Sequence, residues 1–226
     1  MDESARVTRQ QVSDSVSPLG WRLVLGAIHT EVLTPSLVAA AEAATLSVSA
    51  VGDDGQGHLT VDVRSDRAVL RLRSADVGAV TGRDVRLARE VSNALSANGM
   101  RATPGAGSLQ ALEIAIDALD IPAVRPFWKA ITGYVDEPGP SDLSNGLIDP
   151  IGRGPAIWFQ QMDEPRLQRS RIHLDVDVPH DVATPRIDAA IAAGGRLLYD
   201  EEAPAFWVLA DPEGNEACIC TWQGRD

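Results

Sequence analysis

Two segments about 60 residues apart follow the same pattern, and this internal likeness restricts the fold more than any other feature. Residues 171–178 alternate strictly, with aliphatic side chains at even positions and His173 among charged side chains at odd positions. Successive side chains of a strand point to opposite faces, so this segment is predicted to bury Ile172 and its aliphatic neighbours and to expose a charged face. Residues 112–120 form a second such strand, with Glu113 at the position equivalent to His173.

Each of these strands leads into a helical pattern that stops at glycine, at Gly133 and at Gly194. Further strands are predicted on the same spacing, the clearest at 155–161, 196–200, 205–210 and 216–222. A constant offset over strand, helix and strands indicates a duplicated βαβββ unit. Two such units can form a half-barrel whose concave face is lined by alternating residues.

The N-terminal part has a different order of elements. Helices are predicted at 7–17, from Thr34-Pro35 onward, and from Thr81 to about Asn98. Strands are predicted at 22–25, 28–33, 58–63 and 68–73. The predicted class is α+β, with an N-terminal antiparallel sheet that has helices on one face and C-terminal paired βαβββ modules that form a half-barrel.

A segment of small and flexible residues, 102–108, reads as a linker. We therefore predict two domains, 1–101 and 109–226, within the 226 residues.

Composition limits the partners and the compartment. The formal net charge is −12, which disfavours binding to nucleic acid. The acidic start has no apolar run after it, and no apolar stretch reaches the length of a membrane span, so we expect neither secretion nor membrane insertion. Cys218 and Cys220 form no disulfide framework and read as small apolar residues, so the cytoplasm is the expected location.

Several motifs in the C-terminal part together resemble the vicinal oxygen chelate superfamily, which includes glyoxalase I, bleomycin-resistance proteins and extradiol dioxygenases. The resemblance covers 112–222 and rests on Phe127-Trp128, Gly133-Tyr134, the strand at 171–175 and the closing segment Trp207–Glu216. Its most specific part is the Asp-Pro-Glu-Gly-Asn hairpin at 211–215. The resemblance implies the half-barrel fold and a small-molecule site on its concave face.

The same resemblance implies metal ligands from four strands, two in each module. The matching positions are Glu113, Trp158, His173 and Cys218, and tryptophan cannot ligate a metal. Gln160 and Glu216 share these faces and replace the last-strand ligands only if the register shifts. Two clear ligands do not complete a centre, so a divalent metal is disfavoured, no metal ligand is assigned and the cofactor stays unknown.

His173 has two interpretations. It is a catalytic acid or base in the cavity, facing Glu113 of the sister strand, or it is a structural histidine held by Asp175 or Arg171. A neighbouring carboxylate would raise the histidine pKa and set its tautomer.

The predicted ligand-binding residues share the inward phase of their strands or lie beside His173. They are Trp158, Gln160, Arg171, Glu216, Cys218 and Trp222. Two tryptophans with few polar groups are typical of a small-ligand pocket, and core packing of the tryptophans is the alternative.

Residues 7–98 resemble the pterin-4a-carbinolamine dehydratases more faintly, through Gly20-Trp21 and the helix that contains Asp84. The catalytic His-His-Pro of that family falls on Gly57-His58-Leu59, and its later histidine falls on Ala75. Carbinolamine dehydration needs placed acid and base groups. With one of these histidines present, His58 and Asp84 are interpreted as a vestigial, inactive site.

The leading functional hypothesis is a glyoxalase-like protein that acts on or binds a small molecule, with lyase- or isomerase-type proton transfer by His173 and Glu113. The alternatives are metal-independent sequestration of a small molecule, as in resistance proteins, and residual pterin carbinolamine dehydratase activity. Whether the chain is an enzyme stays open. A homodimer is expected by analogy with the dehydratase-like fold.

Overall fold

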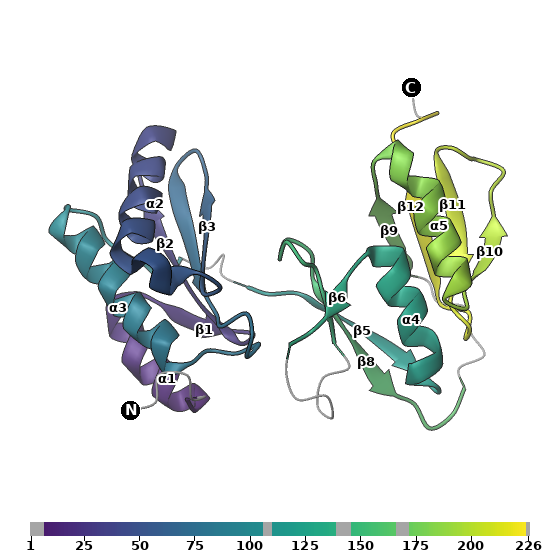
Figure 1. The fold of residues 1–226 in the computed structure, drawn as a ribbon, viewed down its shortest axis with the longest axis horizontal. Coiled ribbons are helices and arrows are strands. Elements are labelled where there is room, and N and C mark those ends of the chain that lie inside the picture. Colours follow the sequence, from purple (N-terminus) through teal and green to yellow (C-terminus); the bar gives the residue numbers. More distant parts are fainter. Residues whose placement is uncertain (1–6, 106–109, 139–145, 166–171, 225–226) are drawn as a thin grey trace. The chain divides into compact units, whose positions relative to one another are not determined.

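The computed structural model describes residues 7–105, 110–138, 146–165 and 172–224. The chain divides into two compact units, one formed largely by residues 1–111 and the other by residues from 112 onward. Each unit has its own hydrophobic core. We describe them separately (Figure 1).

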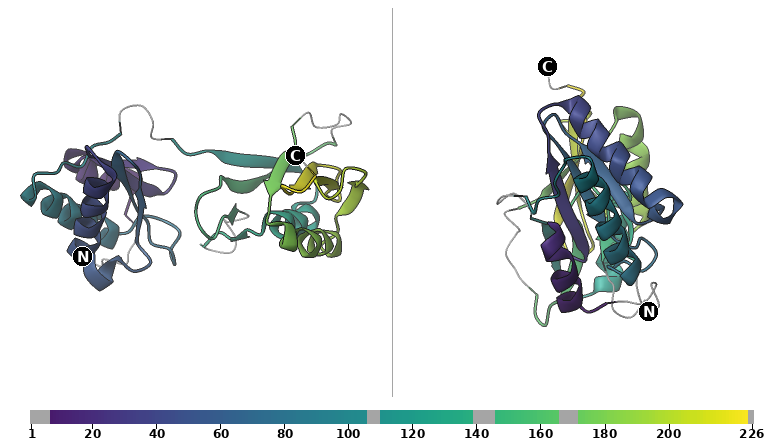
Figure 2. Two further views of the ribbon diagram at one scale, coloured as in Figure 1. Left: turned by 90° about the horizontal axis from the view of Figure 1, so that it is seen from above. Right: turned by 90° about the vertical axis from the view of Figure 1, so that its left-hand side faces the viewer.

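The first unit is an antiparallel sheet with helices packed on it. The strand order is β1-β2-β4-β3, with β1 (Arg22–Val24), β2 (Ala27–Leu33), β3 (Leu59–Val63) and β4 (Arg67–Leu72). The helices are α1 (Arg9–Val16), α2 (Leu37–Val51) and α3 (Gly82–Ala97), with short 3₁₀ turns η1 (Ser17–Leu19) and η2 (Gly52–Gly55). Helices α2 and α3 lie side by side, as the right-hand view of Figure 2 shows.

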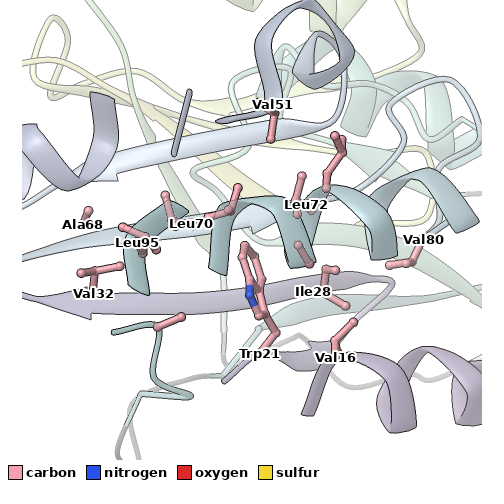
Figure 3. Close-up of a cluster of buried hydrophobic side chains, with 14 of the residues drawn as sticks. Val16, Trp21, Ile28, Val32, Val51, Ala68, Leu70, Leu72, Val80 and Leu95 are labelled. Atoms are coloured by element: carbon pink, nitrogen blue, oxygen red, sulfur yellow. The ribbon is translucent and has the colours of Figure 1, made fainter. Parts of the chain in front are cut away.

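Trp21 lies at the centre of this unit. Its ring is fully buried among side chains of β2, β4 and α3, which include Ile28, Leu70 and Leu95 (Figure 3). The indole Nε1 donates a 2.9 Å hydrogen bond to Ser92 Oγ, so the one polar atom of the ring is satisfied within the core.

Local sequence explains where these helices begin. Thr81 caps α3 through a capping box with Asp84, as predicted. Helix α2 is capped by Ser36, whose side chain accepts from the backbone of Ala39, so the prediction of Thr34 as the cap is wrong. Pro35 precedes this cap and therefore lies outside the helix.

The second unit contains the predicted duplication. The first repeat runs β5 (Glu113–Ala118), α4 (Ile121–Thr132), β6 (Val135–Asp136), β7 (Leu147–Ile148) and β8 (Ala156–Gln161). The second runs β9 (Leu174–Asp177), η3 (His180–Val182), α5 (Ala183–Ala192), β10 (Arg196–Tyr199), β11 (Phe206–Ala210) and β12 (Glu216–Cys220). The sheet orders are β5-β8-β7-β6 and β10-β11-β12-β9.

Each repeat closes in the same way, because its first strand pairs in parallel with its last strand, β5 with β8 and β9 with β12. Helices α4 and α5 pack against each other, and one core contains side chains from both repeats. The predicted α+β class with paired βαβββ modules is confirmed.

One detail of the sequence prediction is wrong. Strand β9 begins at Leu174, where its pairing with Ala217 of β12 begins, and the preceding Ile172 is 78% exposed. Leu174 and Val176 do pack against the core, as the alternation predicted. Ile172 precedes the paired part of the sheet, so the alternation does not bury its side chain.

No helix within the described ranges is both long and apolar enough to cross a bilayer.

Candidate functional site

The sheet of the second repeat, β10-β11-β12-β9, packs one face against the core, and we call its other face the open face. Leu174 and Val176 of β9, with Ala217 and Ile219 of β12, pack in the core. The alternation therefore places the intervening residues of both strands on the open face. Cys218 lies directly beside Asp175 in the parallel ladder.

A compact group of polar side chains forms at this point of the ladder. His173 precedes β9, and its Nε2 lies 3.3 Å from Asp175 Oδ1. The candidate ligand atoms of His173, Asp175 and Cys218 all lie within 4.8 Å of one another. His173 and Asp175 are exposed to solvent, whereas Cys218 is buried.

The environment of Cys218 keeps its thiol protonated. Burial, and then the charge of the Asp175 carboxylate and a hydrogen bond to it, raise the pKa of the thiol to about 12. At neutral pH the thiol therefore donates to Asp175 and is a poor nucleophile. The group suits hydrogen bonding and proton transfer better than thiolate chemistry.

A hollow of about 640 Å³ lies on the open face beside this group. It is lined by side chains from β10, β11 and β12 and from the turn after β10, namely Leu198, Tyr199, Glu202, Phe206, Val208 and Glu216. Val208 pairs with Cys218 in the antiparallel ladder, so the hollow lies next to the polar group. It is a shallow depression that is open to solvent, and not an enclosed cavity.

The predicted site residues of the first repeat lie on the corresponding face of their own sheet. Glu113 is at the start of β5, and Trp158 and Gln160 are on β8. All three are exposed, Trp158 to 40% of its surface. In the described ranges, the group of candidate metal ligands does not contain Glu113.

Trp222 and Arg171 complete the predicted set. Trp222 follows the end of β12 and is 63% exposed. Its indole Nε1 lies 3.3 Å from His180 Nδ1, and the two rings pack edge to face with centroids 5.5 Å apart. Arg171 lies outside the described residues. Glu216 lines the hollow and Cys218 belongs to the polar group, so these two predicted residues share one face.

The metal centre implied by the sequence resemblance does not fit these residues. Trp158 offers no donor atom, and the donors that gather belong to the second repeat alone. Cys218 must also lose a proton that its surroundings hold tightly before it can ligate. The residues present therefore do not form a four-strand centre.

The first unit has its own buried polar network around the predicted vestigial site. His58 Nδ1 lies 2.8 Å from Asp84 Oδ1. Asp84 is fully buried, and its Oδ2 accepts from the Thr81 backbone and hydroxyl at 2.7 and 2.8 Å and from Ser74 Oγ at 3.1 Å. The structure thus brings His58 and Asp84 together.

Gly57 and Ala75 occupy the positions of the other two histidines of the dehydratase pattern, and both lie close to His58. The Ala75 backbone N–H donates to the carbonyl of Gly57 at 2.9 Å, which places these two residues side by side. Neither residue has a side chain that can move a proton. His58 is therefore the one acid–base group that the pattern supplies at this place.

The sequence reasoning missed the aromatic lining of the hollow. Tyr199 and Phe206 stack with ring centroids 6.0 Å apart and an interplanar angle of 23°. Phe206 and Val208 pair with Cys220 and Cys218, so their side chains point to the same face as that of Cys218. The alternation of the sequence could therefore have identified them as lining residues. Tyr199 follows a register shift in β10, so no simple alternation places it.

Comparison with known families agrees with the duplicated sheet. Residues 113–220 match the family model described as a glyoxalase-like domain. The matched segment begins at β5 and ends at β12, so it contains both repeats and the hollow.

Several solved structures match about half of the chain at low identity. A glyoxalase/bleomycin resistance protein/dioxygenase family enzyme from Burkholderia phytofirmans PsJN is 21% identical, with 48% of this chain and 95% of that chain covered and a TM-score of 0.35. A glyoxalase-related enzyme from Fulvimarina pelagi is 20% identical, with coverage of 50% and 88% and a TM-score of 0.37. A fosfomycin resistance protein from Mesorhizobium loti is 13% identical, with coverage of 54% and 96% and a TM-score of 0.41. No curated protein matches the chain.

Proposed function

We propose that the chain binds a small molecule on the open face of the β9–β12 sheet and sequesters it there without a metal. The observation that carries this proposal is the hollow beside the His173–Asp175–Cys218 group. An aromatic and aliphatic lining with a few polar groups is the usual composition of such sites. The glyoxalase-like match of 113–220 supports a small-molecule role for this part of the chain.

Filling the hollow tests the proposal. Leu198 lines the hollow and is 48% exposed, so Leu198→Trp can block the space without disturbing the core. The adjacent Leu197 is also exposed and does not line the hollow, which makes Leu197→Trp the matched control. Compounds that raise the unfolding temperature of the unaltered protein are expected to lose that effect with Leu198→Trp and to keep it with Leu197→Trp. Equal responses of both variants would contradict a site in the hollow.

A second candidate is an enzyme that transfers protons with His173, with Glu113 as the other acid–base group. The contact between His173 and Asp175 favours it, because a carboxylate orients an imidazole and sets its tautomer. His173→Ala is expected to abolish turnover, or to weaken ligand binding, while the fold persists. If the variant unfolds and the folded fraction responds to ligand as before, His173 has a structural role.

For the first unit we propose a dehydratase-like fold without activity, and residual pterin carbinolamine dehydratase activity is the alternative. His58 and Asp84 supply one oriented acid–base pair, and Gly57 and Ala75 supply none. Purified protein is expected to show no dehydration of a pterin carbinolamine above the rate without protein. A rate that His58→Ala abolishes would establish the alternative.

We further propose that the protein works in the cytoplasm as a homodimer. Cys218 and Cys220 are buried and form no disulfide, as suits a reducing compartment. Helix α2 exposes Leu37, Val38 and Val48, an apolar surface that a second copy can cover. Val38→Asp is expected to shift the sedimentation coefficient to that of a monomer, and an unchanged coefficient would exclude this surface.

A further inference from the structure

We propose that the hollow on the open face takes an organic cation, such as an ammonium or guanidinium group carried on a compact apolar body. This proposal rests on the proposed binding function and specifies its ligand class. It follows from the rings, the carboxylates and the charge of the surrounding face.

The rings provide the first part of the argument. Tyr199 and Phe206 stack at 6.0 Å with an interplanar angle of 23°, and both line the hollow. Aromatic faces carry partial negative charge and attract cations within about 6 Å of the ring centre. Leu198 and Val208 provide apolar surface for the remainder of the ligand.

The carboxylates provide the second part. Glu202 and Glu216 line the hollow, and among the described residues that line it there is no lysine, arginine or histidine. Tyr199 donates a hydrogen bond to Glu202, and partial burial together with the nearby charges of Glu202 and Glu201 raises the tyrosine pKa. A carboxylate has about four acceptor positions, so Glu202 can also accept from a ligand ammonium.

The surrounding face has the same sign of charge. Asp175 and Asp177 lie in register with Cys218 and Cys220, so their carboxylates are on the face that bears the hollow. Arg196 lies on the same face at the Glu216 end of the hollow, because both residues pair with Ala210, and its positive charge offsets part of this negative charge. The net charge of the chain is −12, which favours the approach of cations and opposes that of anions.

A neutral apolar ligand fits this lining less well. It would remove water from the Glu202 carboxylate without replacing the lost hydrogen bonds, and that removal costs free energy. An anionic ligand would meet like charge in addition.

Three probes that share a hydroxymethylphenyl body and carry a cationic, a neutral or an anionic end group test the ligand class. They are 4-(hydroxymethyl)benzylammonium, its neutral isostere 4-ethylbenzyl alcohol, and 4-(hydroxymethyl)phenylacetate, each titrated into the full-length chain and followed by two-dimensional NMR. The cation is expected to shift resonances around the hollow and to bind about tenfold more tightly than the isostere. The anion is expected not to bind.

Two variants locate the source of this selectivity. Glu202→Gln removes a lining carboxylate and is expected to reduce the preference for the cation several-fold, and Phe206→Leu is expected to reduce it through loss of a ring face. Asp188→Asn changes the net charge equally at an exposed position of α5 that does not line the hollow, so it is expected to leave the preference unchanged.

The outcomes separate the ligand class from the binding function. If the neutral isostere or the anion binds in the hollow as tightly as the cation, the cationic class is wrong and the binding function stands. If Asp188→Asn lowers the preference as much as Glu202→Gln, general charge attraction and not the hollow selects cations, which also overturns the proposal. If no probe shifts the resonances of the hollow and Leu198→Trp changes no ligand response, the binding function itself fails.

Discussion

At the scale of single residues, His29 is expected to make the stability of the first unit depend on pH. It lies on β2 between Arg22 of β1 and Arg71 of β4. Burial, and then the charge of Arg71, lower its pKa from 6.5 to about 4. The folded state therefore holds a neutral imidazole over a pH range in which the unfolded state binds a proton.

This difference predicts how stability changes with pH. The contribution of His29 is fully present above pH 6.5 and is lost as the pH falls from 6.5 toward 4. Because the ring is only partly buried, the expected loss is on the order of 1–2 kcal/mol. Urea unfolding of the unaltered chain and of His29→Gln at pH 4.5 and pH 7 measures it. A gap between the two proteins that is the same at both pH values would contradict the prediction.

Part of the candidate site could be predicted from the alternation of residues along the strands. Alternation placed His173 and Asp175 on one face, and the spacing from the hairpin identified Cys218 as the last-strand residue of that face. The distance between them depends on the register of β9 against β12, strands about 40 residues apart, and this register is set by packing in the core. Alternation was extended to Trp222, which lies beyond the end of β12 and contacts His180 instead.

At the scale of elements, the hairpin between β11 and β12 joins the two repeats. Asp211 is fully buried and accepts from the backbones of Glu213 and Asn215 at 2.9 Å. Its other oxygen accepts from Trp128 Nε1 of α4 at 3.0 Å. The Glu213 carboxylate in turn accepts from the backbones of Leu119 and Asp120, just before α4. The hairpin therefore fixes a helix of the other repeat.

Removing the Asp211 carboxylate should loosen this junction. Asp211→Ala leaves the buried Trp128 indole without an acceptor and frees the turn, so we expect a loss of about 3 kcal/mol in the free energy of unfolding. Asp188→Ala, at an exposed position of α5, is the control and is expected to change stability by less than about 0.5 kcal/mol. Denaturant unfolding compares them, and similar losses for both would show that the hairpin does not hold the repeats together.

The element order was predictable because the repeat preserves its spacing. The glycines that end the helices and the strands of the two repeats recur at nearly the same offset, and this regularity revealed the duplication. The sequence does not determine which strands become neighbours. In each repeat the first strand pairs with the last strand, although two other strands lie between them in the sequence. This pairing depends on the helix that packs across the sheet. The exposure of Ile172 has the same origin, since alternation does not report where a partner strand begins.

At the scale of the whole molecule, the two cores have no residue in common. The segment that leaves the first core is still bound to it, since Thr103 exchanges backbone hydrogen bonds of 2.9 and 2.8 Å with Glu31 of β2. Ala102 is buried in the same core. The first unit is therefore expected to need residues beyond the predicted boundary at 101 for full stability.

Fragments of the chain test this expectation. Fragments 1–105 and 110–226 should each fold, because each contains a complete core, and their amide resonances should overlay those of the full chain except near the cut. A fragment ending at residue 101 loses two backbone hydrogen bonds and a buried methyl group, which together should cost about 2 kcal/mol. Thr103→Val in the longer fragment is the control, because it keeps the backbone bonds and removes only the Thr103 hydroxyl, which donates to the Glu31 carbonyl at 3.2 Å. Equal stability of the two fragments would place the end of the first unit at residue 101, and failure of either long fragment to fold would show that the two units depend on each other.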